Sequence, residues 1–469
     1  MKKNVFYAVF IIPLIMNICF CVKAQAGLWD YFISKIPLPS VSYCYENAEN
    51  LKNFQDIIAD SELPVKKIAL PAIAKNKRHS FADIKKIRKL FEEKKFFEIE
   101  KYYSTCFETR LDYDSRDNMR AVIATLAENI KNTELLLEEW RKENPASHLP
   151  CLLLANYYIN KAWESRGSDW ASKVTEEGWK GFHKYLKTAH EEITAAYQIN
   201  PADPNIASTA ITVALGMGLD FGKCKAWFDR AISADPYHTT AYCNMMYYML
   251  PKWYGSWELS KSVCDEAIKK IEYNSDLFLP LRSYYIDQCC VNSYSDNDEV
   301  YNKNYKAEYK KIYYSKLKSI YEELSVKYPD AHIIHALYCY DMYDYKEERK
   351  LAFEKLKYVI KQIDSEQYRN YSDPPKYFFY NKYAWTLSTS KNDEIYNPEL
   401  ALFYAKKAVD LMPEWEWSLD TLAGAYAANG DFKSAIETQI KAKKAGKGYF
   451  KKKCDNKIAQ YEKGVAPRY

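Results

Sequence analysis

The side chains that could form a catalytic or metal site are scattered in this sequence. It has seven histidines, and only His332 and His335 are close enough to share one face of a helix, as two metal ligands would. No further ligand pattern surrounds them, so we interpret both as ordinary surface or core histidines. Adjacent acids such as Glu191 and Glu192 lie among lysines, which is typical of a solvated helix face. Phosphate-binding glycine loops, zinc-protease motifs and nucleophile elbows are missing from the sequence. We therefore expect no enzymatic activity, no cofactor and no metal.

A more specific arrangement occurs at 249-MLPKWYGSWELS-260, within a sequence that otherwise reads as helix. Pro251 predicts the end of one helix, because proline has no N–H to donate. Gly255 predicts a backbone angle that other residues avoid, and Ser256 is suited to cap the next helix. The stretch is therefore predicted to be the turn between two helices.

The tryptophans of this turn allow two interpretations. Trp253 and Trp257 can cover the end of a helix pair, as large aromatic side chains often do. Alternatively they form a ligand site, because 162-AWESRG-167 also follows a first helix and the insertion 165–179 could fold over the later turn. An arginine beside an indole would suit a carboxylate or a peptide terminus. The candidate residues of this edge are Trp163, Arg166, Trp170, Lys252, Trp253 and Trp257.

The elements that position these residues follow a repeat of about 35 residues. Ala189, Ile193, Ala196 and Pro201 are spaced at offsets 0, 4, 7 and 12. Offsets of 4 and 7 place three side chains on one helical face, and the proline ends the helix. Each unit is therefore predicted to be a helix pair that its neighbour must bury. The same offsets recur at Cys224, Phe228, Ala231 and Pro236, at Leu317, Tyr321, Leu324 and Pro329, and at Ala401, Ala405, Ala408 and Pro413.

This spacing resembles the tetratricopeptide repeat. The most typical copy is 417-WSLDTLAGAYAANGDFKSAIETQIKAKKAG-446, with Leu422, Ala423, Tyr426 and Gly430 at the family's packing and turn positions. The resemblance implies an all-α fold, a right-handed α-solenoid of antiparallel helix pairs, and a concave face that binds protein or peptide. The family's lysine and asparagine clamp for carboxylate tails is not visible. The candidate residues of the concave face are Asn205, Ser208, Thr212, Thr240, Tyr247, Trp417 and Asp420.

A second resemblance covers the middle of the chain. Residues 162-AWESRG-167 and 251-PKWYGS-256 are similar to the W-x-x-R-G and P-K-W-x-G-S motifs of an uncharacterised branch of exported bacterial repeat proteins, a domain of unknown function. The resemblance implies a fold and supplies no activity.

The N-terminus is typical of an export signal. Residues 1–26 combine Lys2 and Lys3, an apolar run, and Ala24-Gln25-Ala26 as a small-x-small cleavage pattern. We expect a periplasmic or secreted protein, and the alternative is an uncleaved N-terminal membrane anchor. We predict an extended leader over 27–77, a helical domain of unknown function over 78–290, a polar loop over 291–303, and repeats with a capping helix over 304–469.

The net charge, the cysteines and a lysine-rich stretch limit the kinds of partner and of covalent cross-link that we expect. The formal charge is +5, and it falls to +2 without the three lysines of the signal, so we expect no nucleic acid. Ten of the twelve cysteines lie after the signal, and in an exported protein some could pair. The lysine-rich stretch 441–453 is interpreted as a solvated cap, with weak attraction to anionic lipid as the alternative.

These observations predict an exported scaffold that binds protein or peptide partners through the concave face, with possible help from the tryptophan-rich edge. Two alternatives remain at this point. One is an enzyme or small-ligand receptor built on Arg166, Lys252 and the tryptophans, and the other is a self-associating structural protein of the envelope.

Overall fold

The computed structural model describes twelve stretches of the chain, and every regular element in them is a helix. The predicted signal (1–26), the predicted leader (27–77) and most of the predicted loop (291–303) lie outside these residues. The described residues are 84–109, 113–128, 132–167, 171–271, 275–293, 303, 307, 310–329, 332–343, 349–364, 376–446 and 449–468.

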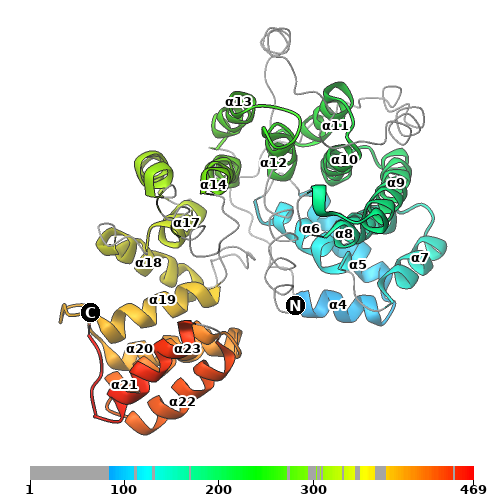
Figure 1. The fold of residues 1–469 in the computed structure, drawn as a ribbon. Helices are drawn as coiled ribbons and strands as arrows, with labels where there is room; N and C mark the ends of the chain where they lie inside the picture. The colour runs from blue at the N-terminus through cyan, green and yellow to red at the C-terminus, as the bar shows by residue number, and fades with distance from the viewer. Residues whose placement is uncertain are drawn as a thin grey trace. The chain divides into compact units, whose positions relative to one another are not determined.

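The chain divides into two compact units between Tyr313 and Tyr314. Figure 1 labels the α-helices of the first unit from α4 to α14 and colours them by residue number. The described helices of this unit are α4 (Ile84–Glu92), α5 (Phe96–Glu108), α6 (Tyr113–Leu126), α7 (Thr133–Glu143), α8 (Leu149–Arg166), η3 (Ala171–Lys173), α9 (Glu176–Ile199), α10 (Pro204–Met217), α11 (Phe221–Ala234), α12 (Thr239–Tyr248), α13 (Trp257–Ile268), η4 (Ser275–Phe278) and α14 (Leu279–Ser293).

A π-helix, η5 (Lys310–Leu317), spans the division, and the second unit continues in the same helical manner. Its helices are α16 (Lys318–Lys327), α17 (His332–Met342), α18 (Arg349–Asp364), α19 (Lys376–Thr389), α20 (Pro398–Leu411), α21 (Glu416–Ala428), α22 (Phe432–Ala445) and α23 (Tyr449–Tyr461).

Helices pack in consecutive pairs within each unit. In the first unit α8 packs on α9, α10 on α11 and α12 on α13, while α10 also contacts α12 and α12 contacts α14. In the second unit α19 packs on α20, α21 on α22 and α22 on α23, while α19 also contacts α21. This order, in which each first helix meets its own partner and the next first helix, is that of a helical repeat. The predicted all-α helical-repeat fold is confirmed.

The predicted repeat positions form the core of the helix pairs. Ala189, Ile193 and Ala196 in α9 are fully buried, and the corresponding residues of α11, of α20, and of the end of η5 and α16 are 0–5% exposed. The small side chains bring the neighbouring helix close, so removing them from water contributes packing as well as hydrophobic free energy. Helix α9 ends at Ile199, two residues before Pro201, as the spacing predicts.

The insertion predicted between Pro145 and Pro201 is mostly helix. Helix α8 has 18 residues and α9 has 24, whereas α10 and α11 have 14 each. Thr175 caps α9 by accepting a hydrogen bond from the Gly178 N–H at 3.0 Å. The extra residues therefore lengthen the helix pair, because a longer amphipathic helix keeps its backbone hydrogen-bonded and a long loop does not.

The turn at 249–256 is built largely as predicted, with one difference. Ser256 caps α13 by accepting a hydrogen bond from the Leu259 N–H at 3.2 Å. Gly255 does not have the positive φ that we expected, since the described glycines with positive φ are Gly167, Gly218, Gly430 and Gly464. A Cβ at Gly255 would instead overlap the Met249 backbone carbonyl. Glycine is required here by close approach of the backbone.

We expect Gly255→Ala to destabilise the first unit by about 1–3 kcal/mol, because the clashing atoms belong to the backbone and cannot rotate away. Urea denaturation followed by circular dichroism measures the change. Gly424→Ala is the matched control, since a Cβ there meets only the Tyr461 hydroxyl at 3.9 Å and should be neutral or slightly stabilising. Equal stability of Gly255→Ala and wild type would contradict this account of the turn.

The cysteines whose side chains the structure describes are buried packing residues. Burial raises the pKa of the Cys106 and Cys151 thiols to about 11, so they are poor nucleophiles. These buried cysteines are Cys106, Cys151, Cys224, Cys243, Cys264, Cys289, Cys339 and Cys454.

Candidate functional site

The two tryptophan motifs meet in the first unit. Trp163 lies in the last turn of α8, and Trp253 lies in the turn between α12 and α13. Their ring centroids are 6.2 Å apart in an edge-to-face arrangement, at an interplanar angle of 81°. Trp163 also packs edge-to-face on Phe182 of α9, at 4.9 Å. Residues separated by 90 positions in the sequence thus form one aromatic cluster.

Arg166 belongs to the same cluster. Its guanidinium carbon lies 5.6 Å from the ring centroid of Trp163 and 5.4 Å from that of Trp179, both within cation–π distance. It also donates a hydrogen bond to the Gly167 carbonyl at 3.1 Å. Gly167 ends α8 with a φ of +74°, a conformation that favours glycine. The W-x-x-R-G motif therefore closes a helix and stacks its arginine on indole rings.

The cluster contains a hydrogen-bond donor that the protein itself does not use. The indole nitrogen of Trp163 is buried and has no acceptor among the described residues, whereas the Trp253 indole interacts with the Tyr247 hydroxyl. A buried unsatisfied donor costs about 1–3 kcal/mol, so such atoms are unusual. An acceptor-only group such as a carboxylate would complement this donor. Ligand binding at the edge stays a prediction.

The remaining edge candidates contact α14. Lys252 forms an ion pair with Asp287 and lies 4.2 Å from the ring centroid of Tyr247. Burial opposes the protonation of Lys252, but the Asp287 carboxylate outweighs it and raises the lysine pKa above its ordinary value. Trp257 packs edge-to-face on Tyr284 at 5.6 Å. Lys252 thus contacts α14 from the turn, and Trp257 contacts it from the first position of α13. Trp170 lies outside the described residues.

The concave-face candidates of the first unit have different environments. Asn205 and Ser208 are buried and bonded within the protein, with 5% and 1% of their surface exposed. Thr212, Thr240 and Tyr247 are half-buried. The sequence could not separate these two groups, because both lie on first helices at similar offsets.

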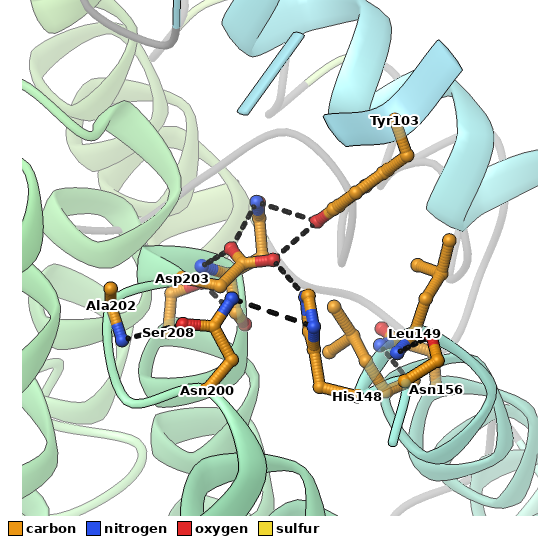
Figure 2. A network of polar contacts seen from close by, with 11 residues as sticks. Tyr103, His148, Leu149, Asn156, Asn200, Ala202, Asp203 and Ser208 are labelled. Atoms are coloured by element: carbon orange, nitrogen blue, oxygen red, sulfur yellow. Dashed lines mark hydrogen bonds and ion pairs between the residues drawn. The ribbon is translucent and has the colours of Figure 1, made fainter. Parts of the chain in front are cut away.

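Asn205 and Ser208 belong to a buried polar network at the starts of α8 and α10 (Figure 2). At its centre Asp203, fully buried, accepts hydrogen bonds from the Tyr103 hydroxyl at 2.6 Å and from the Asn205 N–H and side-chain amide, both at 2.9 Å. His148 Nε2 lies 3.0 Å from the same carboxylate. Burial alone would raise the Asp203 pKa, but these bonds outweigh it and hold the pKa below its ordinary value.

The network fixes the hydrogen-bonding roles of the two ring nitrogens of His148. Asn200 accepts a hydrogen bond from the Ala202 N–H at 3.2 Å through Oδ1, so its amide nitrogen is the atom that faces His148 Nδ1 at 3.4 Å. We infer that Nδ1 accepts and that Nε2–H donates to Asp203. Both ring nitrogens are therefore occupied within the protein. This histidine–aspartate pair joins helices and leaves no nitrogen for acid–base work on a substrate.

A second aromatic group lies on the face shared by α19, α21 and α23. Lys453 of α23 lies 4.7 Å from the ring centroid of Trp417 in α21 and 5.6 Å from that of Trp385 in α19. Trp417 also packs edge-to-face on Phe450 at 4.9 Å. We call Trp385, Trp417, Phe450 and Lys453 the aromatic–lysine face. Trp417 is 43% exposed, and it is the one exposed tryptophan within the described ranges.

Beneath this face lies a buried ion pair. Asp420, the other concave candidate of α21, is 2% exposed and accepts bonds from Lys457 Nζ at 2.8 and 2.9 Å and from the Gln439 amide at 2.9 Å. Lys457 in turn lies 4.4 Å from the ring centroid of Trp385. Asp420 is therefore a support for the aromatic–lysine face and is not itself accessible.

Sequence reasoning found Trp417 and missed Trp385 and Lys453. A signal was present, because Trp385 directly follows Ala384, the packing alanine of the preceding repeat's first helix. Lys453 was hidden in the lysine-rich stretch 441–453, where nothing in the sequence distinguishes it from its neighbours.

Comparison with known proteins finds a domain model of unassigned function that matches part of the chain. Residues 83–218 match the model of the domain of unknown function DUF4034. This range contains the first tryptophan motif and the network around Asp203, and it ends before the second motif at 251–256. No curated protein matches the chain.

The chain also resembles a solved structure, the crystal structure of the yeast Tom70, at 14% sequence identity. The alignment covers 81% of this chain and 86% of that chain, with a TM-score of 0.31.

No helix in the described ranges is both long and apolar enough to cross a membrane. The same ranges contain no group of three or more histidine, cysteine or acidic side chains arranged to hold a metal.

Proposed function

We propose that this protein is an exported scaffold that binds a protein or peptide partner, and that the aromatic–lysine face of its second unit is the principal contact surface. The observation that carries the proposal is the exposure of Trp417 on a first helix. Most of the first-helix residues around it are buried, including Leu419, Ala423 and Ala427. Packing of the repeat therefore does not require a tryptophan at this position.

The chemistry of the face suits a macromolecular partner. Tryptophan is enriched among the residues that dominate binding energy at interfaces, because it buries a large rigid surface at a low entropy cost. The first helices of repeat proteins commonly supply such surfaces to extended or helical peptides. Phe450 and Trp385 hold Trp417 and Lys453 in place from two neighbouring helices, so little ordering is needed on binding.

Binding, and not catalysis, is the activity that we propose. The His148–Asp203 pair has both ring nitrogens engaged within the protein, which suits a structural role. Export rests on the N-terminal 26 residues, whose charged start, apolar run and Ala24-Gln25-Ala26 pattern fit a cleaved signal.

Crosslinking capture from the native envelope tests the proposal, with wild type compared with Trp417→Ala. We expect a discrete partner to be captured by wild type and lost, by tenfold or more, in the variant. Phe403→Ala is the matched control, because Phe403 is also an exposed aromatic residue (52%) but lies on the second helix α20. It should capture normally.

The same experiment separates the competing sites. Trp253→Ala is included, and loss of the partner in that variant alone, with its fold intact, would move the binding site to the tryptophan cluster of the first unit. Equal capture by all variants would overturn the proposed face. Capture of a second copy of this chain in place of another protein would identify a self-associating component.

A further inference from the structure

The charges beneath the aromatic–lysine face do not cancel. Two ammonium groups share the single carboxylate of Asp420, with Lys457 at 2.8 Å and Lys453 at 3.5 Å. The closer pair is almost fully buried, with 4% of the Lys457 side chain and 2% of the Asp420 side chain exposed. Asp420 is thus neutralised by Lys457, and one positive charge remains on Lys453.

Lys453 is the accessible member of the group. Its side chain is 32% exposed, and its Nζ lies 4.7 Å from the ring centroid of Trp417 and 5.6 Å from that of Trp385. An ammonium group packed against indoles is partly desolvated and has lost rotamer freedom before any ligand arrives, which strengthens its attraction to an anion. The preceding lysines, Lys451 and Lys452, are exposed on the same helix and add positive charge.

We infer that the partner segment bound at the aromatic–lysine face is an acidic peptide. A carboxylate side chain of that segment pairs with Lys453, and an apolar side chain beside it packs on Trp417. This inference rests on the proposed function and names the chemistry of the partner. An acidic peptide fits better than a lipid surface, because the Lys453 side chain packs against aromatic rings with only 32% of its surface exposed and does not extend into solvent as a lipid-binding lysine would.

Fluorescence anisotropy of labelled peptides on the purified full chain tests the inference. The probes are one peptide of alternating glutamate and leucine and a second in which every glutamate is glutamine. We expect the glutamate peptide to bind about tenfold or more tightly than the glutamine peptide, and to weaken as salt is added. Lys453→Gln should reduce the affinity for the glutamate peptide to about that of its neutral counterpart.

Lys441→Gln is the matched control, because it removes the same charge from an exposed position of α22 and should change the affinity less than about twofold. Thermal unfolding of each variant checks that the Asp420–Lys457 pair has survived. Equal binding of the two peptides, or equal effects of Lys453→Gln and Lys441→Gln, would overturn the inference.

The two proposals fail in different ways. If neither peptide binds while capture of a native partner still depends on Trp417, the acidic class is wrong and the scaffold stands. If vesicles of anionic lipid bind through Lys453 and peptides do not, the partner is a membrane surface. If both peptide binding and partner capture are absent, the proposed function fails as well.

Discussion

Replacing Asp203 with alanine is expected to destabilise the first unit by about 3–5 kcal/mol. The carboxylate is fully buried and serves the Tyr103 hydroxyl, His148 and the Asn205 N–H at the same time. Its loss leaves buried donors without an acceptor and removes the N-cap of α10, and effects within one buried network exceed the cost of a single bond. Urea denaturation followed by circular dichroism measures the change.

Asp220→Ala is the matched control for this prediction. Asp220 caps α11 by accepting a hydrogen bond from the Lys223 N–H at 3.1 Å, but it is exposed and has no role in a buried network. Its loss should cost about 1 kcal/mol, the ordinary value of a cap. Similar losses in the two variants would show that Asp203 acts as a cap alone and that the network in Figure 2 contributes little.

The same carboxylate predicts a dependence of stability on pH. The folded pKa of Asp203 is lowered relative to an unfolded value of about 3.9, so the folded state binds its proton less readily than the unfolded chain. The contribution of Asp203 to the free energy of unfolding is fully present above the pKa of this side chain in the unfolded chain. It is lost as pH falls through the pKa of the same side chain in the folded protein. Wild type should therefore lose its stability advantage over Asp203→Asn below about pH 4. An advantage that stays constant down to pH 2 would contradict this assignment.

Replacing Asp420 with alanine is expected to have a comparable effect on the second unit, about 3–5 kcal/mol. The substitution leaves the Lys457 ammonium buried without its counter-ion, and breaking a buried pair on one side costs more than removing both charges. The double variant Asp420→Leu with Lys457→Met should recover most of the lost stability, because it replaces the pair with apolar groups of similar volume. Thermal unfolding by circular dichroism checks both variants.

Asp455→Ala provides the comparison for an exposed pair. Asp455 bonds Lys443 at 2.5 Å, with 54% and 40% of the two side chains exposed, and solvent screens such a pair. We expect a small change in stability there. A small change in Asp420→Ala as well would mean that Lys457 finds another partner or loses its proton, and the charge argument for Lys453 would lose its basis.

The spacing of residues in the sequence was sufficient to predict the helical repeat. Offsets of 4 and 7 followed by proline predicted the buried faces of α9 and α20 and the residues at which both helices end. These features depend on neighbours within a dozen residues, and helical periodicity and proline geometry act over that range. The cap at Ser256 was predictable for the same reason, since a cap bonds the N–H three residues on.

Features that depend on contacts between repeats were harder to predict. The meeting of Trp163 with Trp253 was expected as one of two possibilities, and Trp163 takes part in it from the last turn of α8. Asn205 and Trp417 were predicted to line the same kind of face, yet one is 5% exposed and the other 43%. Burial depends on which side chain a neighbouring helix places opposite, and a single repeat does not contain that information.

The sequence by itself thus determined an all-helical repeat, its packing positions, and the turn that contains Trp253. Tertiary structure decided which polar side chains became a buried network around Asp203 and which lysine was left beside the exposed indole of Trp417. Tyr103 and Asp203 are separated by 100 residues, and Lys457 and Asp420 by 37. Contacts over such separations are set by the way helix pairs stack, because stacking alone brings distant side chains within hydrogen-bond distance.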